Sequence, residues 1–512
     1  MLDNQTNIFE MLYQTFKIKT PIKLITLFSG YDSQALALKY LGVDFELYKT
    51  CEWAIKSIQA LKDLHFGEDN TDYSKDMTLE QIKEYLFNKG ISSNYNDPMT
   101  KKQVNRLNEK QVRTIYNNIK ATHNLVNIQQ VKGNDLEIKD KDKYCYIMTY
   151  SFPCQDLSLA GKGKGMSDTS TRSGMLWEVE RILSECEDKP QILLMENVPQ
   201  VHGEGNKEDF NKWQLRLEEM GYKNYWRDLI ATDYGIPQTR NRCFMVSLLG
   251  DYNYTFPKPI PLKLKLKDML EDNVDEKYYL SEKGMEYICG NAFNPNLKDM
   301  YDRNNALLNR NNAYCLNTKI DRRAGDSNYI LEGYGETTIK DYLKIKNATK
   351  QGYLEATDGD GIDISSRMQH HRGTVQKDKA QTLTTQCDRG VVVNMKTESC
   401  NNLIKEGKVK ENDITRHSYT TARSEEWEKR NVEQNNLSPT LDTRCDCLGV
   451  VNNMRIRKLT PKECFRLMGV KDEDFEKIAK NQSDSSLYHL AGDSIVVNVL
   501  TAIFKEMILW IK

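Results

Sequence analysis

The sequence predicts an α/β protein in which a mostly parallel sheet carries helices on both faces, joined to a smaller loop- and β-rich second domain. Three observations support this prediction. A strand–turn–helix unit occupies residues 21–41, and strand-like runs then alternate with helical patterns as far as residue 249. Strands that alternate with helices are typical of parallel sheets covered on both faces. After residue 257 the alternation stops and the chain becomes rich in Asn, Asp, Arg, Thr and Gly.

Each element of the first domain has its own pattern. The apolar run at 21–30 ends on Gly30, and apolar residues at helical spacing follow from Gln34 to Leu41. Further strands are expected at 45–51, 144–150, 192–195 and 243–249, and further helices at 175–186 and 211–220. The polar, Lys- and Asn-rich stretch at about 55–128 predicts an inserted helical segment without a core of its own.

The Pro-rich segment 257–261 separates the two domains. We expect the first domain at 1–255, the second at 256–453, and a C-terminal segment at 454–512 that returns to the first. The second domain contains a degenerate repeat that suggests a recurring β-turn element, with copies at 313–321, 380–388 and 438–446. In the C-terminal segment, Thr460 as N-cap and Pro461 at the first helical position predict a helix at 457–469. The apolar run at 492–511 predicts a strand followed by a helix.

Composition excludes several classes of protein. The chain has 512 residues, with 72 Lys plus Arg against 73 Asp plus Glu, for a net charge of −1. A uniformly basic nucleic-acid-coating protein and an acidic disordered chain are both excluded, although a locally basic cleft is not. The 12 cysteines contain no Cys-x-x-Cys pair, so neither a disulfide scaffold nor a zinc site is expected. Neither a signal peptide nor a membrane span is expected.

Chemistry-bearing residues follow the predicted strands. Cys154 comes after Pro153 at a strand end, where open α/β sheets place their ligands. A free cysteine is more often a small buried hydrophobe, but a basic Gly-rich loop lies just downstream, and basic surroundings favour the nucleophilic thiolate. Glu196 follows the next strand, and Arg240 and Arg242 precede another, pointing the same way on an extended segment. Taken singly, a charged strand end is more often solvated or a helix cap.

Read in order, these segments resemble the DNA (cytosine-5) methyltransferase family. The resemblance covers about residues 24–500 and rests on eight segments: 28–30, 52–53, 133–135, 153–155, 196–198, 238–242, 457–469 and 492–497. It implies the Rossmann-like fold of S-adenosylmethionine-dependent methyltransferases. The chain departs from the family in four places. Gly30 is followed by Tyr31-Asp32-Ser33 instead of further glycine, Ser151 stands where glycine is common, and Asp493 replaces the usual Asn. Because of the helical insertion, Asp135 also follows Glu52 by about eighty residues, much more than is usual in the family.

The resemblance implies a role for each matching residue. Cys154 would attack carbon 6 of cytosine, Glu196 would hydrogen-bond ring nitrogen 3, and Arg242, supported by Arg240, would hold the exocyclic oxygen. S-adenosyl-L-methionine would be the methyl donor, with no metal. The residues that would bind this cofactor are Phe28, Gly30, Glu52, Trp53, Asp135, Leu136, Pro153, Leu176, Asp493, Ser494 and Ile495.

The resemblance also implies double-stranded DNA as partner, read by the second domain as a target-recognition domain. Thr440-Leu441 matches the family's Thr-Leu dipeptide and Thr382-Leu383 is a second match, although a repeated β-turn core element is the simpler interpretation of both. Expected DNA contacts are Gln155, Lys162, Lys164, Thr382, Arg389, Thr440 and Arg444. The protein would be a monomer in the cytoplasm or nucleoid of a bacterium. A phage source and a cognate restriction endonuclease stay open.

Three other functions agree less well with the sequence. A tRNA (cytosine-5) methyltransferase is the nearest, but that branch keeps the second domain small. A catalytically silent DNA-binding relative is disfavoured because Cys154, Glu196 and Arg242 are all present. A nicotinamide-dependent oxidoreductase is set aside because no Gly-x-Gly-x-x-Gly follows the first strand.

Overall fold

The computed structural model describes residues 17–153, 173–279, 342–364, 372–383, 389–395, 414–416, 432–433, 448–450 and 453–508. The chain divides into two compact units. Unit 1 comprises 1–264, 382–387 and 461–512, and unit 2 comprises 265–381 and 388–460. We describe each unit by itself.

Unit 1 contains a six-stranded sheet in the order β2-β1-β3-β4-β6-β5. Its strands are β1 (Ile22–Leu27), β2 (Phe45–Cys51), β3 (Cys145–Tyr150), β4 (Ile192–Asn197), β5 (Tyr222–Ile230) and β6 (Asn241–Leu249). β1, β2, β3 and β4 are parallel, while β6 runs antiparallel to both β4 and β5. The predicted α/β class with a mostly parallel sheet is confirmed.

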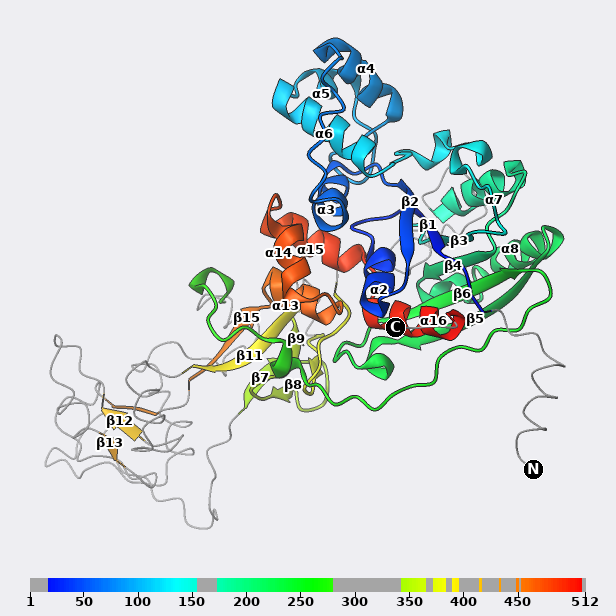
Figure 1. Cartoon of the computed structure of the whole chain (residues 1–512). Helices are drawn as coiled ribbons and strands as arrows, with labels where there is room; N and C mark the ends of the chain where they lie inside the picture. Colours follow the sequence, from blue (N-terminus) through cyan, green and yellow to red (C-terminus); the bar gives the residue numbers. More distant parts are fainter. Residues whose placement is uncertain are drawn as a thin grey trace, which may run out of the picture. The chain divides into compact units, whose positions relative to one another are not determined.

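Helices cover both faces of this sheet. On one face, α7 (Leu176–Glu185) and α8 (Lys207–Glu219) join a core cluster with alternate strand residues such as Met148, Met195 and Met245. On the other face, α2 (Ser33–Leu41) and α16 (Val497–Met507) pack side by side (Figure 1). The 3-10 turns η1 (Ile128–Gln130), η2 (Gly133–Leu136), η4 (Ser173–Met175), η5 (Pro199–His202) and η6 (Ala231–Tyr234) connect these elements.

The expected insertion is helical, but the expectation that it lacks a core is wrong. It begins with α3 (Ile55–His65) and continues through α4 (Leu79–Lys89), α5 (Lys101–Asn105) and α6 (Glu109–Ala121), which Figure 1 shows as a compact group. α4, α5 and α6 each begin with a reciprocal capping box, which satisfies backbone donors at their first turns. Their apolar faces bury a separate hydrophobic cluster that includes Ile82, Leu86, Val112 and Ile119.

Two expectations for the C-terminal segment are corrected. The predicted helix at 457–469 begins only at Pro461, as α13 (Pro461–Leu467), because Arg457 and Lys458 belong to strand β15 (Asn453–Lys458). The predicted strand at the start of 492–511 is absent from the described residues 492–508. Instead α15 (Asp484–Asp493) follows α14 (Asp472–Ala479), and α16 begins after a short extended link at Ser494–Val496.

The stretch Asp484–Met507 is apolar and long enough to cross a membrane by length and composition alone. In the structure this stretch forms the two separate helices α15 and α16, and 67% of its apolar 18-residue window is buried inside the protein. The apolar residues of α16, such as Ile503 and Phe504, are fully buried. This stretch is therefore accounted for as core of unit 1.

Unit 2 consists of short strands and turns. A four-stranded antiparallel sheet has the order β10-β9-β11-β15, with β9 (Gly361–Asp363), β10 (Val375–Gln376) and β11 (Arg389–Met395). β7 (Leu343–Lys346) pairs with β8 (Tyr353–Ala356), and β12 (Ile414–Arg416) pairs with β13 (Val432–Glu433) and β14 (Leu448–Val450). The turns η7 (Leu266–Met269) and η8 (Glu276–Tyr278) precede them. The loop- and β-rich character predicted for this part of the chain is present in its described residues.

Candidate active site

The turn that follows β1 has an unusual backbone. Phe28, Gly30 and Asp32 all adopt positive φ, at 59°, 57° and 65°. The left-handed region disfavours most side chains but accepts glycine readily and aspartate more readily than most other residues. Asp32 also caps α2, since its Oδ1 accepts a hydrogen bond from the backbone N–H of Ala35 at 3.0 Å and its Oδ2 accepts one from Thr26 Oγ1 at 2.7 Å. Asp32 thus provides the left-handed turn where the resembled family has a further glycine.

The same turn is hydrogen-bonded to the end of β2. The backbone N–H of Ser29 donates to the Cys51 carbonyl at 3.2 Å, and Ser29 Oγ accepts from the Cys51 N–H at 3.1 Å. One residue later, Glu52 Oε2 accepts a hydrogen bond from the Gly30 N–H at 3.0 Å, and Glu52 Oε1 accepts one from the Ala54 N–H at 2.8 Å. The turn after β1 therefore fixes the carboxyl group of Glu52, which directly follows the neighbouring parallel strand β2.

This carboxyl group suits a nucleoside that carries hydroxyl donors. Burial is the main cause that raises the pKa of Glu52 to about 7, and the charge of Asp493 contributes to the rise. A Cβ built on Gly30 would meet nothing within 4 Å, so there is open space directly beside the Glu52 contact. A half-buried acceptor thus lies next to open space at the carboxyl ends of parallel strands, where open α/β sheets place their ligands.

The other expected cofactor residues are placed as follows. Asp493 and Ser494 lie at the end of α15, with the Asp493 carboxyl close enough to Glu52 to affect its pKa. Asp135 accepts a hydrogen bond from the Lys132 N–H at 2.8 Å, which is a local turn contact. Leu136 and Leu176 are fully buried in the core cluster. The remaining expected residues lie near element ends. Phe28 directly follows β1, and Pro153 lies three residues after the end of β3. Trp53 and Ile495 each lie two residues before a helix, α3 and α16 respectively.

A second group of polar residues gathers at the ends of β3, β4 and β6. Glu196, 4% exposed, forms an ion pair with Arg242, with Oε1 3.1 Å from Nε. Its other oxygen accepts a hydrogen bond from the Ser151 hydroxyl at 2.5 Å. Asn197 Nδ2 donates to the Phe152 carbonyl at 3.0 Å, which joins the end of β4 to the segment that leads to Pro153. Ser151, where the family often has glycine, thus contacts the candidate acid directly.

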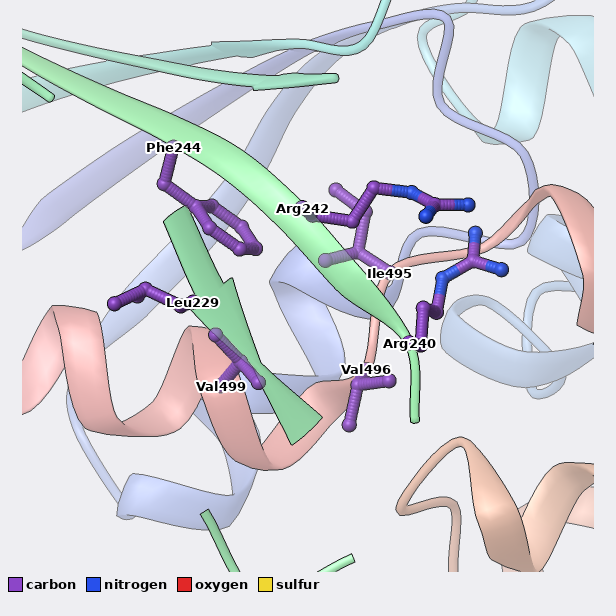
Figure 2. Close-up of a pocket in the computed structure, with 7 residues that line it drawn as sticks. All are labelled: Leu229, Arg240, Arg242, Phe244, Ile495, Val496 and Val499. Atoms are coloured by element: carbon purple, nitrogen blue, oxygen red, sulfur yellow. The ribbon is translucent and has the colours of Figure 1, made fainter. Parts of the chain in front are cut away.

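Arg240 lies apart from this ion pair. It is 4% exposed, and its guanidinium donates to the carbonyls of Gly492 at 3.0 Å, Ser494 at 2.7 Å and Leu383 at 3.3 Å. Figure 2 shows the Arg240 and Arg242 guanidinium groups at one end of a pocket whose other lining residues, such as Phe244 and Val499, are apolar. Arg240 therefore joins the link between α15 and α16 to the segment that precedes β6.

The expected DNA contacts are only partly described. Cys154, Gln155, Lys162, Lys164, Thr440 and Arg444 lie outside the described residues. Arg389 begins β11 in unit 2. Thr382 belongs to unit 1, where its hydroxyl donates to the Thr239 carbonyl at 3.4 Å, and the N–H of the buried Leu383 donates to Gln238 Oε1 at 3.3 Å. These contacts give Thr382-Leu383 a packing role beside the arginine segment.

A histidine, a carboxylate and a thiol also meet near the ends of β4, β5 and β6. The ligand atoms of His202, Asp228 and Cys243 lie within 4.8 Å of one another, a spacing that could hold a metal ion. His202 Nε2 already lies 3.0 Å from Asp228 Oδ1. Burial first, and then the charges of Asp228 and Glu196, raises the pKa of the Cys243 thiol well above its ordinary value. A thiol held neutral in this way is a poor metal ligand.

Sequence reasoning missed two residues near Glu52. Tyr95, from the insertion, stacks on His489 of α15, with ring centroids 3.6 Å apart. They are separated by almost four hundred positions, so no local pattern could pair them. The available signal was weak: Tyr95 lies in the Asn- and Pro-containing break of the insertion, and His489 lies four residues before Asp493.

Comparisons with known proteins show the family to which the chain belongs. The family model described as C-5 cytosine-specific DNA methylase matches residues 88–509. The chain is 29% identical over 491 residues to the type II methyltransferase M2.ScrFI of Lactococcus lactis subsp. cremoris, covering 95% of this chain and 99% of that relative. It is 35% identical over 268 residues to the orphan methyltransferase M.SssI of Spiroplasma monobiae, covering 51% and 67%. A solved methyltransferase structure from Entamoeba histolytica aligns with 96% of this chain and 98% of its own, at 12% identity and a TM-score of 0.46. Because the family model spans most of its length, the chain belongs to the C-5 cytosine-specific DNA methylase family.

Proposed function

We propose that this protein transfers a methyl group from S-adenosylmethionine to carbon 5 of a cytosine flipped out of a specific duplex DNA sequence. The observation that carries the proposal is the buried Glu196, held by Arg242 and Ser151 at the ends of adjacent strands. The segment that leads to Pro153 is fixed to the same place by Asn197. Family membership supports the transfer of the remaining roles onto matching residues.

The chemistry requires a nucleophile because carbon 5 of cytosine is too weakly nucleophilic to accept a methyl group unaided. The Cys154 thiolate would add to carbon 6, forming a carbon–sulfur bond and moving an electron pair toward carbon 5. Glu196, as a proton donor, would hydrogen-bond ring nitrogen 3 and offset the charge that develops there. Arg242 would hold both the Glu196 carboxyl and the exocyclic oxygen. Carbon 5 would use this electron pair to take the methyl group, leaving S-adenosylhomocysteine. Loss of the carbon-5 proton would then restore the carbon 5–carbon 6 double bond and break the carbon–sulfur bond, which releases the Cys154 thiolate.

S-adenosylmethionine supplies an electrophilic methyl group when it is bound. In this chain Glu52 would accept hydrogen bonds from the ribose, with Gly30 leaving room beside it. Arg240 would keep Asp493 and Ser494 in place through its hydrogen bonds to the carbonyls of Gly492 and Ser494. The Lys- and Gly-rich residues after Cys154 are proposed to contact the DNA backbone, since lysines near phosphates position a duplex without reading its sequence.

Unit 2 is proposed as the target-recognition domain, because it is a separate unit between the arginine segment and α13. The target base must leave the stack, at a cost of a few kcal/mol, because its ring atoms are inaccessible inside a duplex. We further propose that the protein acts as a monomer in a bacterial cytoplasm, with or without a cognate restriction endonuclease. Type II and orphan methyltransferases both occur among its relatives.

The test is covalent trapping on duplex DNA that contains 5-fluorocytosine, whose fluorine cannot leave as a proton does. With S-adenosylmethionine, the wild-type protein should form an adduct that survives denaturation, and bisulfite sequencing should first locate its target. Cys154→Ala should abolish the adduct and lower methyl transfer by at least about 10³-fold. Cys145→Ala, a buried cysteine on β3, is the matched control and should keep the adduct. Adduct formation by Cys154→Ala, or methyl transfer to tRNA but not to duplex DNA, would overturn the proposal.

A further inference from the structure

A loop of the insertion lies beside the candidate cofactor residues. The N–H of Ser92 donates to the Trp53 carbonyl at 2.8 Å, and the N–H of Ile55 donates to the Ser92 carbonyl at 2.9 Å. The loop that follows, Ser92–Asp97, is shaped by Asn94, whose Oδ1 accepts from the N–H groups of Asn96 and Asp97, each at 3.0 Å. The insertion is therefore fixed to the backbone immediately after Glu52.

This loop presents Tyr95 to α15. The Tyr95 ring lies over His489 with centroids 3.6 Å apart and ring planes at 39°. His489 Nε2 in turn lies 3.0 Å from Asp493 Oδ2. Tyr95 has a φ of 64°, a conformation that is costly for a bulky side chain and that persists only where surrounding contacts enforce it. The contact thus links the insertion to the Asp493 end of α15.

The Tyr95 hydroxyl is buried and makes no hydrogen bond of normal geometry with the described residues, although Ser57 and Ser486 lie nearby. Burial, and then the charges of Glu52 and Asp493, raises the pKa of Tyr95 to about 12. The Tyr95 hydroxyl therefore lies within the electrostatic influence of both carboxyl groups. Buried hydroxyl groups are nearly always paired, so an unpaired one beside a ligand site indicates a missing partner.

We propose that Tyr95 and His489 form a wall of the S-adenosylmethionine site, and that bound cofactor provides the hydrogen-bond partner of the Tyr95 hydroxyl. The inference rests on the proposed function, since it concerns the same cofactor. It gives the insertion a function: its loop closes the side of the site next to Glu52 and Asp493. The carboxyl groups on either side suit a partner that donates hydrogen bonds, such as a ribose hydroxyl or the methionine ammonium group.

The test is the affinity for S-adenosylmethionine and S-adenosylhomocysteine in the absence of DNA, measured by titration calorimetry. Tyr95→Phe keeps the ring and removes only the hydroxyl, so its dissociation constant should rise about 5-fold. Tyr95→Ala also removes the stacking and should raise it about 10- to 100-fold, and His489→Ala should raise it about 5- to 10-fold. Tyr73→Ala is the matched control, because Tyr73 is a tyrosine of the same insertion that is 40% exposed. The affinity of this variant for both compounds should stay within 2-fold of that of the wild type.

Two further results separate this inference from the proposed function. Glu52→Ala should lose cofactor binding; if the wild-type protein binds neither compound, the proposed function itself fails. If Glu52→Ala loses binding but Tyr95→Phe and Tyr95→Ala match the wild type, only the wall is disproved. Should Tyr95→Ala fail to fold, as judged by circular dichroism, Tyr95→Phe and His489→Gln decide the question alone, because neither changes the packing volume greatly.

Discussion

At the scale of single residues, Asp32 shows how a departure from a family pattern keeps the same geometry. Its side chain is fully buried, its φ is 65°, and its carboxyl both caps α2 and accepts from Thr26. Glycine would allow the turn but would provide neither hydrogen bond. Aspartate and asparagine are the residues that combine tolerance of the left-handed region with N-capping.

Asp32→Ala should therefore lower the free energy of unfolding by roughly 2–3 kcal/mol, from the lost cap and the strain of a left-handed alanine. Asp32→Asn should change it by less than about 1 kcal/mol, because the amide oxygen can still cap the helix and the backbone stays acceptable. Urea denaturation followed by circular dichroism measures both variants. Equal stabilities for the two would contradict the role assigned to the turn.

Glu52 makes cofactor affinity depend on pH. Its folded-state pKa of about 7 lies above the ordinary value of 4.5, so the protein without cofactor loses the stability contribution of this group as the pH rises through 7. Ribose hydroxyls need the ionised carboxyl as acceptor, so cofactor affinity should change in the opposite direction. At pH 6 the affinity for S-adenosylhomocysteine should be about tenfold weaker than its plateau above pH 8.

The matched variant is Glu52→Gln, which cannot ionise. Its affinity should be weaker than that of the wild type at pH 8 and nearly constant between pH 6 and 8.5. Without cofactor, its thermal midpoint should vary less between pH 6 and 8.5 than that of the wild type, because glutamine does not titrate. Glutamine has one acceptor oxygen for the N–H groups of Gly30 and Ala54, so one of these two hydrogen bonds is lost. Calorimetric titrations at several pH values provide the comparison. A wild-type affinity that does not vary with pH would show that Glu52 is already ionised well below neutrality.

At the scale of elements, most of the sheet could be predicted because its inner strands β1, β3, β4 and β6 are largely buried and read as apolar runs. β1, β2, β3, β4 and β6 all lie where the sequence indicates. β5 was missed because it is an edge strand whose residues, such as Lys223 and Arg227, are partly exposed and interrupt any apolar run. The core of the insertion was missed for a related reason: its apolar residues are widely spaced among Lys and Asn on short helices.

The contacts of the site also comprise some that the sequence predicts and some that it does not. That Glu196 and Arg242 lie near each other follows from their positions at strand ends, which local patterns reveal. The contacts of Ser151, Arg240 and Tyr95 depend on how distant segments pack, and no spacing rule supplies that information. Arg240 is the clearest case: its sequence position suggests a site group, yet its guanidinium binds three backbone carbonyls from segments more than 140 residues away.

At the scale of the whole molecule, the chain separates chemistry from the proposed target reading. The residues assigned to catalysis and cofactor binding all belong to unit 1, and unit 2 is formed by 265–381 and 388–460. The intervening residues Thr382 and Leu383 belong with unit 1, because they hydrogen-bond to Thr239 and Gln238. A unit that reads DNA should be exchangeable as long as these two residues are kept.

We therefore expect a chimera in which 265–381 and 388–460 are replaced by the aligned residues of the Lactococcus lactis relative to acquire that relative's methylation pattern. Its affinity for S-adenosylhomocysteine should stay within about 2-fold of the parent, because no cofactor residue changes. Bisulfite sequencing of DNA from cells that express the parent, the relative and the chimera makes the comparison. In a second chimera, Thr382 and Leu383 are also changed to alanine; stability should fall while the pattern stays that of the first chimera. If the first chimera keeps the parent's methylation pattern, target recognition lies in unit 1. If the second chimera has a different methylation pattern from the first, Thr382 and Leu383 take a direct part in target recognition.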